Sequence, residues 1–149
     1  MPRNSTSRKS EPAFTKQHFE ALAHFRYALR AFLAFSEQAT RQSGITTQQY
    51  QALLAIKASP EEALLVGELA ERLLLKHNNT VQLVDRLCEA NLVRRTQSKL
   101  DGRAVVISLT AKGQQKIAEL ATLHFRELLS RQKELSAISR LASRMEEMA

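Results

Sequence analysis

The chain has 149 residues, of which 44% are hydrophobic and 25% charged, and its formal net charge is +7. This length suits one domain, or a small domain with a helical extension, and the composition is typical of a soluble globular protein. The apolar runs are shorter than the roughly 18 residues that cross a bilayer, so we expect no membrane partner. The basic charge makes a polyanion the expected large partner, and a basic soluble protein without such a partner is the alternative.

The first twelve residues, 1–12, are polar and lack the apolar centre of a signal peptide. We therefore expect a disordered basic tail and a cytoplasmic protein. The single cysteine, Cys88, cannot form an internal disulfide and fits a reducing compartment. It lies on the flank of the apolar face of its predicted helix, which favours a structural role over a redox switch.

A long first helix is predicted over residues 14–42, where apolar residues recur at spacings of three, four and seven without internal Gly or Pro. Its wide apolar stripe must pack on another surface, and a second copy of the chain is a natural candidate. Ser43-Gly44 predicts the helix end. We assign residues 13–43 to an N-terminal dimerisation helix.

Three further helices are predicted before any strand. Thr46 and Gln49 match a capping box at the start of the first, which stops near Ser59-Pro60. The second spans 66–73, and a brief turn separates it from the third, at 78–90. Two helices joined by such a turn resemble the geometry of a helix-turn-helix unit.

Two strands are predicted over residues 92–96 and 104–109, and in the second apolar and other residues alternate. The polar loop between them contains the turn-forming pair Asp101-Gly102. Two more helical stretches follow, and we assign residues 113–149 to C-terminal dimerisation helices. The predicted fold is mainly α with a small β-hairpin, and residues 45–112 form a winged helix-turn-helix DNA-binding region.

The polar face of the predicted helix 78–90 is suited to a DNA major groove, because Asn, Gln and Arg can form paired hydrogen bonds with base edges. We expect Asn78, Asn79, Gln82 and Arg86 to form this base-reading face. The alternative is an ordinary solvated helix face. The neighbouring helix and the hairpin favour the DNA-binding interpretation.

The hairpin tip carries Lys99, Asp101 and Arg103. A carboxylate at Asp101 can orient the Arg103 guanidinium through a charge-assisted pair and direct it towards a narrow minor groove. A plain hairpin turn with a solvated arginine is the alternative. Phosphate contacts are expected from four further basic residues: Arg72, Lys76, Arg94 and Arg95.

Five motifs occur in an order and spacing that resemble the MarR (multiple antibiotic resistance regulator) family. They are Leu69-Ala70-Glu71-Arg72-Leu73, Leu83-Val84-Asp85-Arg86-Leu87, Leu92-Val93-Arg94-Arg95, Asp101-Gly102-Arg103 and Leu109-Thr110-Ala111-Lys112-Gly113. The resemblance covers about residues 45–115. It implies a homodimeric winged helix-turn-helix regulator whose helix at 78–90 enters the major groove and whose wing arginine, Arg103, reaches the minor groove.

The resemblance also implies release of DNA by a small aromatic or anionic effector, as in many members of that family. Three aromatic residues, Phe25, Phe32 and Tyr50, are candidates for lining an effector pocket, although aromatic residues at helical spacing are more often core or interface. Three histidines, His18, His24 and His124, fall on the predicted dimerisation helices. A zinc site there is a less favoured alternative to surface or pocket histidines, because no carboxylate-histidine cluster accompanies them.

The chain departs from the family pattern at three places. Gln82 stands where many relatives have a basic or small hydroxyl residue, so the base preference cannot be transferred. Asn91 replaces the usual glycine at a helix end. The oxidation-sensing branch has a cysteine near the start of the first helix, and this chain has none there.

We therefore predict a sequence-specific DNA-binding regulator, most simply a repressor, that acts as a homodimer on double-stranded DNA and needs no metal or cofactor. A winged-helix module that binds a protein, such as an antirepressor, is the alternative, and the basic hairpin argues against it. An enzyme is not expected, because the sequence has no glycine-rich phosphate loop, metal-ligand spacing or nucleophile with a recognisable base.

Overall fold

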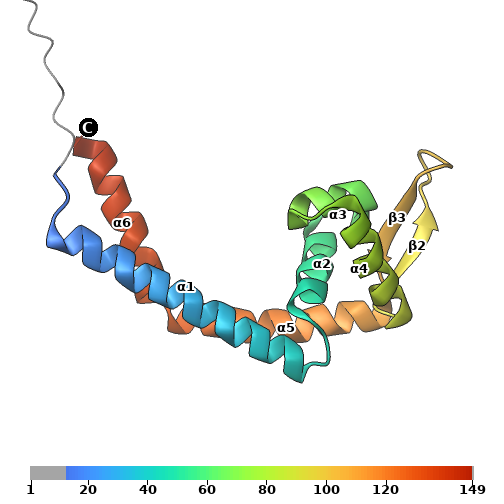
Figure 1. Cartoon of the computed structure of the whole chain (residues 1–149), viewed down its shortest axis with the longest axis horizontal. Coiled ribbons are helices and arrows are strands. Elements are labelled where there is room, and N and C mark those ends of the chain that lie inside the picture. The colour runs from blue at the N-terminus through green and yellow to red at the C-terminus, as the bar shows by residue number, and fades with distance from the viewer. Residues whose placement is uncertain (1–12, 149) are drawn as a thin grey trace, which may run out of the picture. The chain divides into compact units, whose positions relative to one another are not determined.

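A computed structural model describes residues 13–148, so the predicted tail at 1–12 lies outside the described residues. The elements in chain order are α1 (Lys16–Gln42), α2 (Thr47–Ala58), β1 (Ala63–Leu65), α3 (Val66–Leu73), α4 (His77–Glu89), β2 (Val93–Gln97), β3 (Val105–Leu109), α5 (Ala111–Ser130) and α6 (Gln132–Met148) (Figure 1). The prediction of a mainly helical fold with a small hairpin is confirmed. No helix within 13–148 combines the length and apolarity needed to cross a bilayer.

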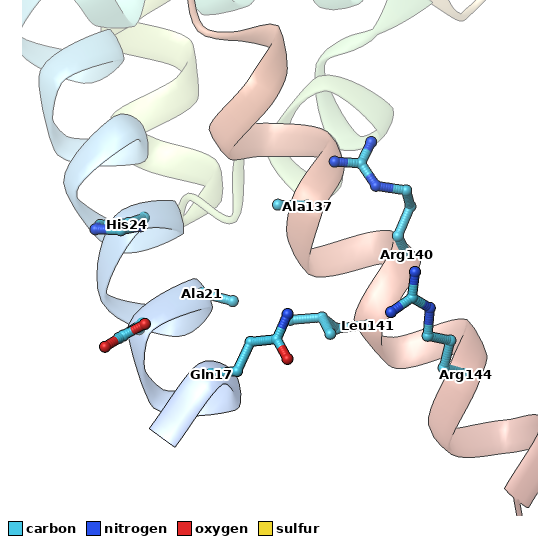
Figure 2. Close-up of a pocket in the computed structure, with 8 residues that line it drawn as sticks. Gln17, Ala21, His24, Ala137, Arg140, Leu141 and Arg144 are labelled. Atoms are coloured by element: carbon cyan, nitrogen blue, oxygen red, sulfur yellow. The ribbon is translucent and has the colours of Figure 1, made fainter. Parts of the chain in front are cut away.

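The chain divides into two compact units. The first contains the beginning of α1, up to Phe32, and the chain from Leu128 onwards, which includes α6. A cavity of about 350 Å³ lies in this unit. Figure 2 shows Gln17, Ala21 and His24 projecting from α1 and Ala137, Arg140, Leu141 and Arg144 from α6 around it.

The second unit, Leu33–Glu127, contains the three-stranded antiparallel sheet and the helices around it. The strand order is β1-β3-β2, with Leu64 opposite Ile107 and Arg95 opposite the same residue from the other side. Strand β1 was not predicted from the sequence, because a strand of three residues is too short to show an alternating pattern. This strand forms only because β3 supplies its hydrogen bonds.

Helix α2 begins and ends at the residues that its sequence predicts. The Gln49 backbone N–H donates to Thr46 Oγ1 (3.1 Å), and the Thr46 N–H donates to Gln49 Oε1 (2.9 Å). At the other end, the Ser59 hydroxyl donates to the Ile56 carbonyl (2.7 Å). Backbone groups left unpaired at both helix ends are thus satisfied by local side chains.

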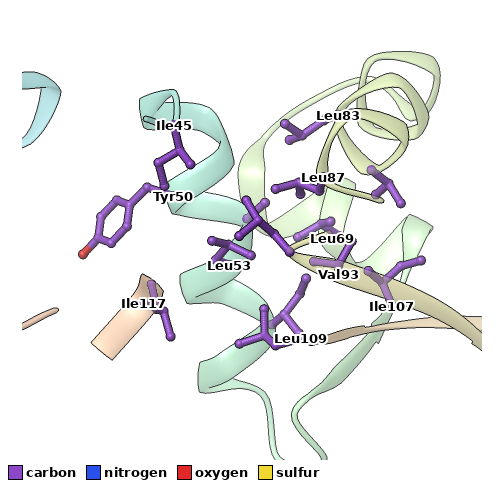
Figure 3. Packing of buried hydrophobic residues seen from close by; sticks show 14 of the residues in the cluster. Ile45, Tyr50, Leu53, Leu69, Leu83, Leu87, Val93, Ile107, Leu109 and Ile117 are labelled. Carbon is purple, nitrogen blue, oxygen red and sulfur yellow. The ribbon is translucent and has the colours of Figure 1, made fainter. Parts of the chain in front are cut away.

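The hydrophobic core of the second unit lies between α2, α3, α4, the sheet and the start of α5 (Figure 3). Its fully buried large side chains include Leu53, Ile56, Leu69, Leu87, Leu92, Ile107 and Leu120. Burying one such side chain stabilises the fold by roughly 1.5–3 kcal/mol. Helix α4 and the strands therefore share one core, which fixes α4 against the hairpin of β2 and β3.

A cluster of hydrogen bonds joins the end of α4 to the start of α5. The Thr110 hydroxyl donates to the Asn91 carbonyl (2.7 Å) and accepts the Gly113 backbone N–H (3.1 Å). The Lys112 ammonium donates to the Ala90 carbonyl (3.0 Å). Asn91 has a φ of 57°, in the left-handed region that asparagine tolerates better than most residues other than glycine. The Leu-Thr-Ala-Lys-Gly motif therefore caps two helices at once.

Glycine is required at position 113 for a steric reason. A Cβ atom there would lie 2.1 Å from the backbone carbonyl oxygen of Leu92, whereas one at Gly67 in α3 would meet nothing within 4 Å. The start of α5 thus packs directly on the backbone that leads into β2.

Replacing Gly113 with alanine should lower the free energy of unfolding by about 2–3 kcal/mol, because the methyl group forces α5 and β2 apart. Gly67→Ala is the matched control and should raise it by up to ~1 kcal/mol, because alanine favours a helix and open space surrounds the site. Urea unfolding followed by circular dichroism measures both. Equal stability of the two variants would contradict the close contact.

Candidate nucleic-acid interface

A three-residue turn joins α3 to α4. Leu74 follows α3 in the left-handed conformation, with φ 55° and ψ 40°, and its N–H donates to the Glu71 carbonyl (3.2 Å). The Leu75 N–H donates to the Ala70 carbonyl (3.0 Å), and its side chain packs against the core. The Leu74 side chain is 93% exposed. The backbone therefore turns sharply enough for α4 to pack across α3 as a helix-turn-helix pair.

Helix α4 has a buried face and a polar face. Thr80, Leu83, Val84 and Leu87 are buried, and the Thr80 hydroxyl donates to the Lys76 carbonyl (3.0 Å). The opposite face exposes the four residues of the predicted base-reading face: Asn78, Asn79, Gln82 and Arg86. The core holds this face towards solvent, and its contact with bases stays a prediction.

The loop between β2 and β3 is held by its own hydrogen bonds. The Ser98 N–H donates to the Ala104 carbonyl (2.8 Å), and the Ala104 N–H donates to the Asp101 carbonyl (3.0 Å). The Asp101 carboxylate accepts the backbone N–H of Arg103 (3.0 Å). This differs from the expected pair with the Arg103 guanidinium: Asp101 shapes the turn, and the exposed Arg103 side chain extends from it.

The neighbouring arginines Arg94 and Arg95 are separated by the pleat of β2. Arg95 lies on the face that β2 turns towards α4, where its guanidinium forms an ion pair with Asp85 and donates to Cys88 Sγ (3.4 Å). Arg94 lies opposite Ser108 on the other face and is exposed. The sequence suggested the same role for both residues. It could not show the bridge between Arg95 and Asp85, because a contact ten residues apart depends on how α4 packs on β2.

Several cations around α4 and the wing remain outside ion pairs. The ion pairs of the described residues include Arg41–Glu37, Lys57–Glu62 and Arg95–Asp85. The exposed basic residues Arg72, Lys76, Arg86, Arg94, Lys99 and Arg103 take part in none of them. This surface combines fixed positive charge with amide donors and acceptors, which suits phosphates and base edges.

The predicted effector residues occur in different surroundings. Tyr50 is buried on α2, and its ring stacks on the His124 imidazole with centroids 4.5 Å apart. Burial raises the pKa of the Tyr50 phenol above its usual value. Phe25 and Phe32 are half-buried residues of α1 in the other unit. The cavity of Figure 2 and a second one of about 270 Å³, beside Thr40 and Thr46, are lined by other residues.

The histidines considered for zinc also have separate surroundings. His18 accepts the Thr15 backbone N–H at Nδ1 (3.0 Å) in the first unit, whereas His124 is buried in the second. Across residues 13–148, no group of three or more His, Cys, Asp or Glu side chains is placed to hold a metal ion.

Comparison with known proteins agrees with this geometry. The sequence profile of the MarR family matches residues 43–104. The HTH-type transcriptional repressor MdtR of Bacillus subtilis (strain 168) is 32% identical over 83 residues, which are 56% of this chain and 52% of that repressor. The chain thus matches about half the length of this curated relative.

Solved structures are similar over nearly the whole chain. Sco3205, a MarR family transcriptional regulator from Streptomyces coelicolor in complex with DNA, is 21% identical, with a TM-score of 0.63 over 90% of this chain and 91% of that one. BpsR of Bordetella bronchiseptica, whose DNA binding is regulated by 6-hydroxynicotinic acid, is 21% identical, with a TM-score of 0.61 over 91% and 96% of the two chains.

The profile match covers the helix-turn-helix and most of the wing, and the solved structures share the fold of the remaining helices. The resemblance carried by the five sequence motifs is therefore confirmed. The chain is similar to the MarR family over residues 43–104 and shares the winged helix-turn-helix fold of its solved members.

Proposed function

We propose that this protein is a sequence-specific DNA-binding transcriptional regulator that acts as a homodimeric repressor. The observation that carries the proposal is the juxtaposition, on one packed core, of an exposed amide-rich face on α4 with a wing loop whose arginine is free of ion pairs. The repressor MdtR and the DNA complex of Sco3205 support it as relatives of the same family.

In this proposal α4 enters the major groove. Gln82, Asn79 and Asn78 read base edges through paired amide hydrogen bonds, and Arg86 grips guanine or a phosphate. Arg103 extends from the loop shaped by Asp101 into the adjacent minor groove, and Lys99 of the same loop adds positive charge. Phosphate contacts by Arg72, Lys76 and Arg94 fix the register of the helix on the duplex.

Apolar side chains on α1 and α5 support the homodimer. Phe19 and Tyr27 on α1 are 59% and 63% exposed, and Phe125 and Leu129 on α5 are 68% and 67% exposed. Large apolar side chains at such exposure are typical of protein interfaces. A two-fold dimer predicts a pseudo-palindromic operator whose half-sites lie about one helical turn, roughly 34 Å, apart.

A small effector that releases DNA is the further part of the proposal. The regulation of BpsR by 6-hydroxynicotinic acid supports an aromatic, acidic molecule as the class to test. Phe25, Phe32 and Tyr50 remain the proposed lining residues. Tyr50 could report ligand binding, because its stacked contact with His124 would change if a ligand bound beside it.

Selection of bound duplexes from a random DNA pool, with and without 6-hydroxynicotinic acid, tests this function. We expect an enriched site with two-fold symmetry and reduced recovery when an effector is present. If the protein shows no preference for any sequence over bulk DNA, it is better described as a winged-helix module that binds another protein. An enriched site without two-fold symmetry would contradict the dimer.

Substitution of the wing arginine tests its proposed DNA contact. Arg103→Ala should weaken binding to the selected operator by about ten- to a hundredfold, because it removes the minor-groove contact. Arg41→Ala, which removes an equal charge from the end of α1, should change affinity little. Fluorescence anisotropy measures both, with circular dichroism to confirm the fold. Unchanged affinity of the Arg103 variant would remove the wing from the mechanism.

The different surroundings of Arg94 and Arg95 predict different effects of substituting them on DNA binding. Arg94→Ala should reduce the slope of log affinity against log salt concentration by about 0.9, because one phosphate contact and its released counterion are lost. Arg95→Ala should leave this slope closer to wild type, since the Arg95 guanidinium is held by Asp85. Titrations between low and moderate salt measure both slopes. Equal reductions would show that Arg95 leaves Asp85 to bind phosphate.

The proposed dimer surface can be tested at Leu129 of α5. Leu129→Glu should weaken self-association by at least about thirtyfold, because a charge replaces an apolar side chain in a buried interface. Leu54→Glu, a change at an exposed leucine of α2, is the matched control. Sedimentation velocity over a range of concentrations measures the dissociation constants. A Leu129 variant that stays dimeric would place the interface elsewhere.

A further inference from the structure

A buried polar pair joins α1 to α5 inside the second unit. His124 on α5 and Ser36 on α1 are each 5% exposed, and His124 Nε2 lies 2.8 Å from Ser36 Oγ. His124 Nδ1 lies 2.6 Å from the Leu120 carbonyl oxygen. Neither His124 nor Ser36 has a role in the proposed DNA contacts.

The chemistry of the groups around His124 determines which atom donates in each hydrogen bond. The Leu120 carbonyl only accepts hydrogen bonds, so His124 Nδ1 carries the hydrogen. In the neutral ring Nε2 then has a lone pair, and the Ser36 hydroxyl donates to it. The ring is thereby fixed to its own helix at one nitrogen and to α1 at the other.

The faces of the same ring contact α2 and α1. Tyr50 on α2 stacks on the imidazole with an interplanar angle of 15°, and Phe35 on α1 meets it edge-on, with centroids 5.8 Å apart. Two more bonds join the same helix ends: Lys116 Nζ donates to the Ser43 carbonyl (2.9 Å), and the hydroxyls of Thr40 and Thr47 lie 3.3 Å apart. Helices α1, α2 and α5 therefore meet at His124.

The contacts around His124 connect the helices of the proposed dimer surface to the DNA-binding region. Helix α2 shares its core with α3, α4 and the sheet, and Ala39 of α1 and Ile117 and Leu120 of α5 pack into the same core. Helices α1 and α5 also carry the exposed apolar residues of the proposed dimer surface. An apolar pair would fill the same space, but a hydrogen-bonded pair also fixes direction and rotation. Any freedom here would change how far apart the two recognition helices of a dimer lie.

We propose that Ser36 and His124 form a positioning junction that sets the separation of the two α4 helices, and hence the spacing of half-sites that the dimer accepts. The proposal rests on the homodimeric DNA-binding function proposed above. It predicts that loss of the junction relaxes the choice of spacing, with a smaller effect on the affinity of one DNA-binding region for one half-site.

A first test needs no DNA. Cys88 is the single cysteine, half-exposed on α4, so a nitroxide label there reports the distance between the two recognition helices in the dimer. Pulsed electron resonance should give a broader distance distribution for Ser36→Ala and His124→Phe than for wild type. Thr122→Ala is the control, because that hydroxyl donates only to Ala118 of its own helix (3.0 Å).

A second test uses the operator selected from the random pool, in versions with one base pair added or removed between the half-sites. The wild-type preference for the selected spacing should fall by about tenfold in Ser36→Ala and His124→Phe. It should be unchanged in Thr122→Ala. Variants that keep the wild-type spacing preference and distance distribution would overturn the junction while leaving the proposed function intact. A wild type that binds its operator without any spacing preference would overturn it too.

The double variant Ser36→Ala/His124→Phe separates positioning from packing. With no buried polar group left unpaired, it should recover thermal stability relative to His124→Phe. We expect its spacing preference to stay relaxed, and recovery of that preference would show that packing alone suffices. If His124→Phe does not fold, Ser36→Ala still tests the bond by removing one oxygen atom. A wild type without sequence-specific binding would contradict the proposed function itself, and the inference with it.

Discussion

The close packing of α5 on the backbone before β2 is the constraint on which the recognition region depends. Gly113 leaves no room between its own Cα and the Leu92 carbonyl, and the Thr110 hydroxyl joins the end of one helix to the start of the next. The same few residues therefore end α4, begin α5 and hold the first strand of the wing.

The surface contrasts with this closely packed interior. The bonds that position α4 and the wing include Thr80 to the Lys76 carbonyl, Arg95 to Asp85, and the strand pairing around Ile107. The outward side chains are left with unused donors and positive charge. The backbone of α4 and the wing is ordered before any partner binds, so the proposed DNA contacts would cost little further conformational entropy of the backbone.

Local patterns predicted most of the helices, because their signals lie within a few residues, as in the Thr46–Gln49 capping box. The sequence also predicted the exposed face of α4 from its helical period. It could not predict β1, which depends on pairing with a distant strand, or the Arg95–Asp85 bridge, which depends on tertiary packing. At the wing, the pairing of Asp101 with a guanidinium was expected, and the carboxylate instead accepts a backbone N–H two residues on, as turn-forming aspartates do.

Leu74 shows how the helix pair depends on its surroundings. A leucine in the left-handed conformation costs about 1–2 kcal/mol, and its exposed side chain gains nothing from packing. Local preference thus opposes this turn, and the buried residues on either side, Leu69 and Leu83, impose it. A peptide containing only α3 and α4 would be expected to lose the angle between them. The angle between α3 and α4 therefore depends on the packing of the whole fold and not on these two helices alone.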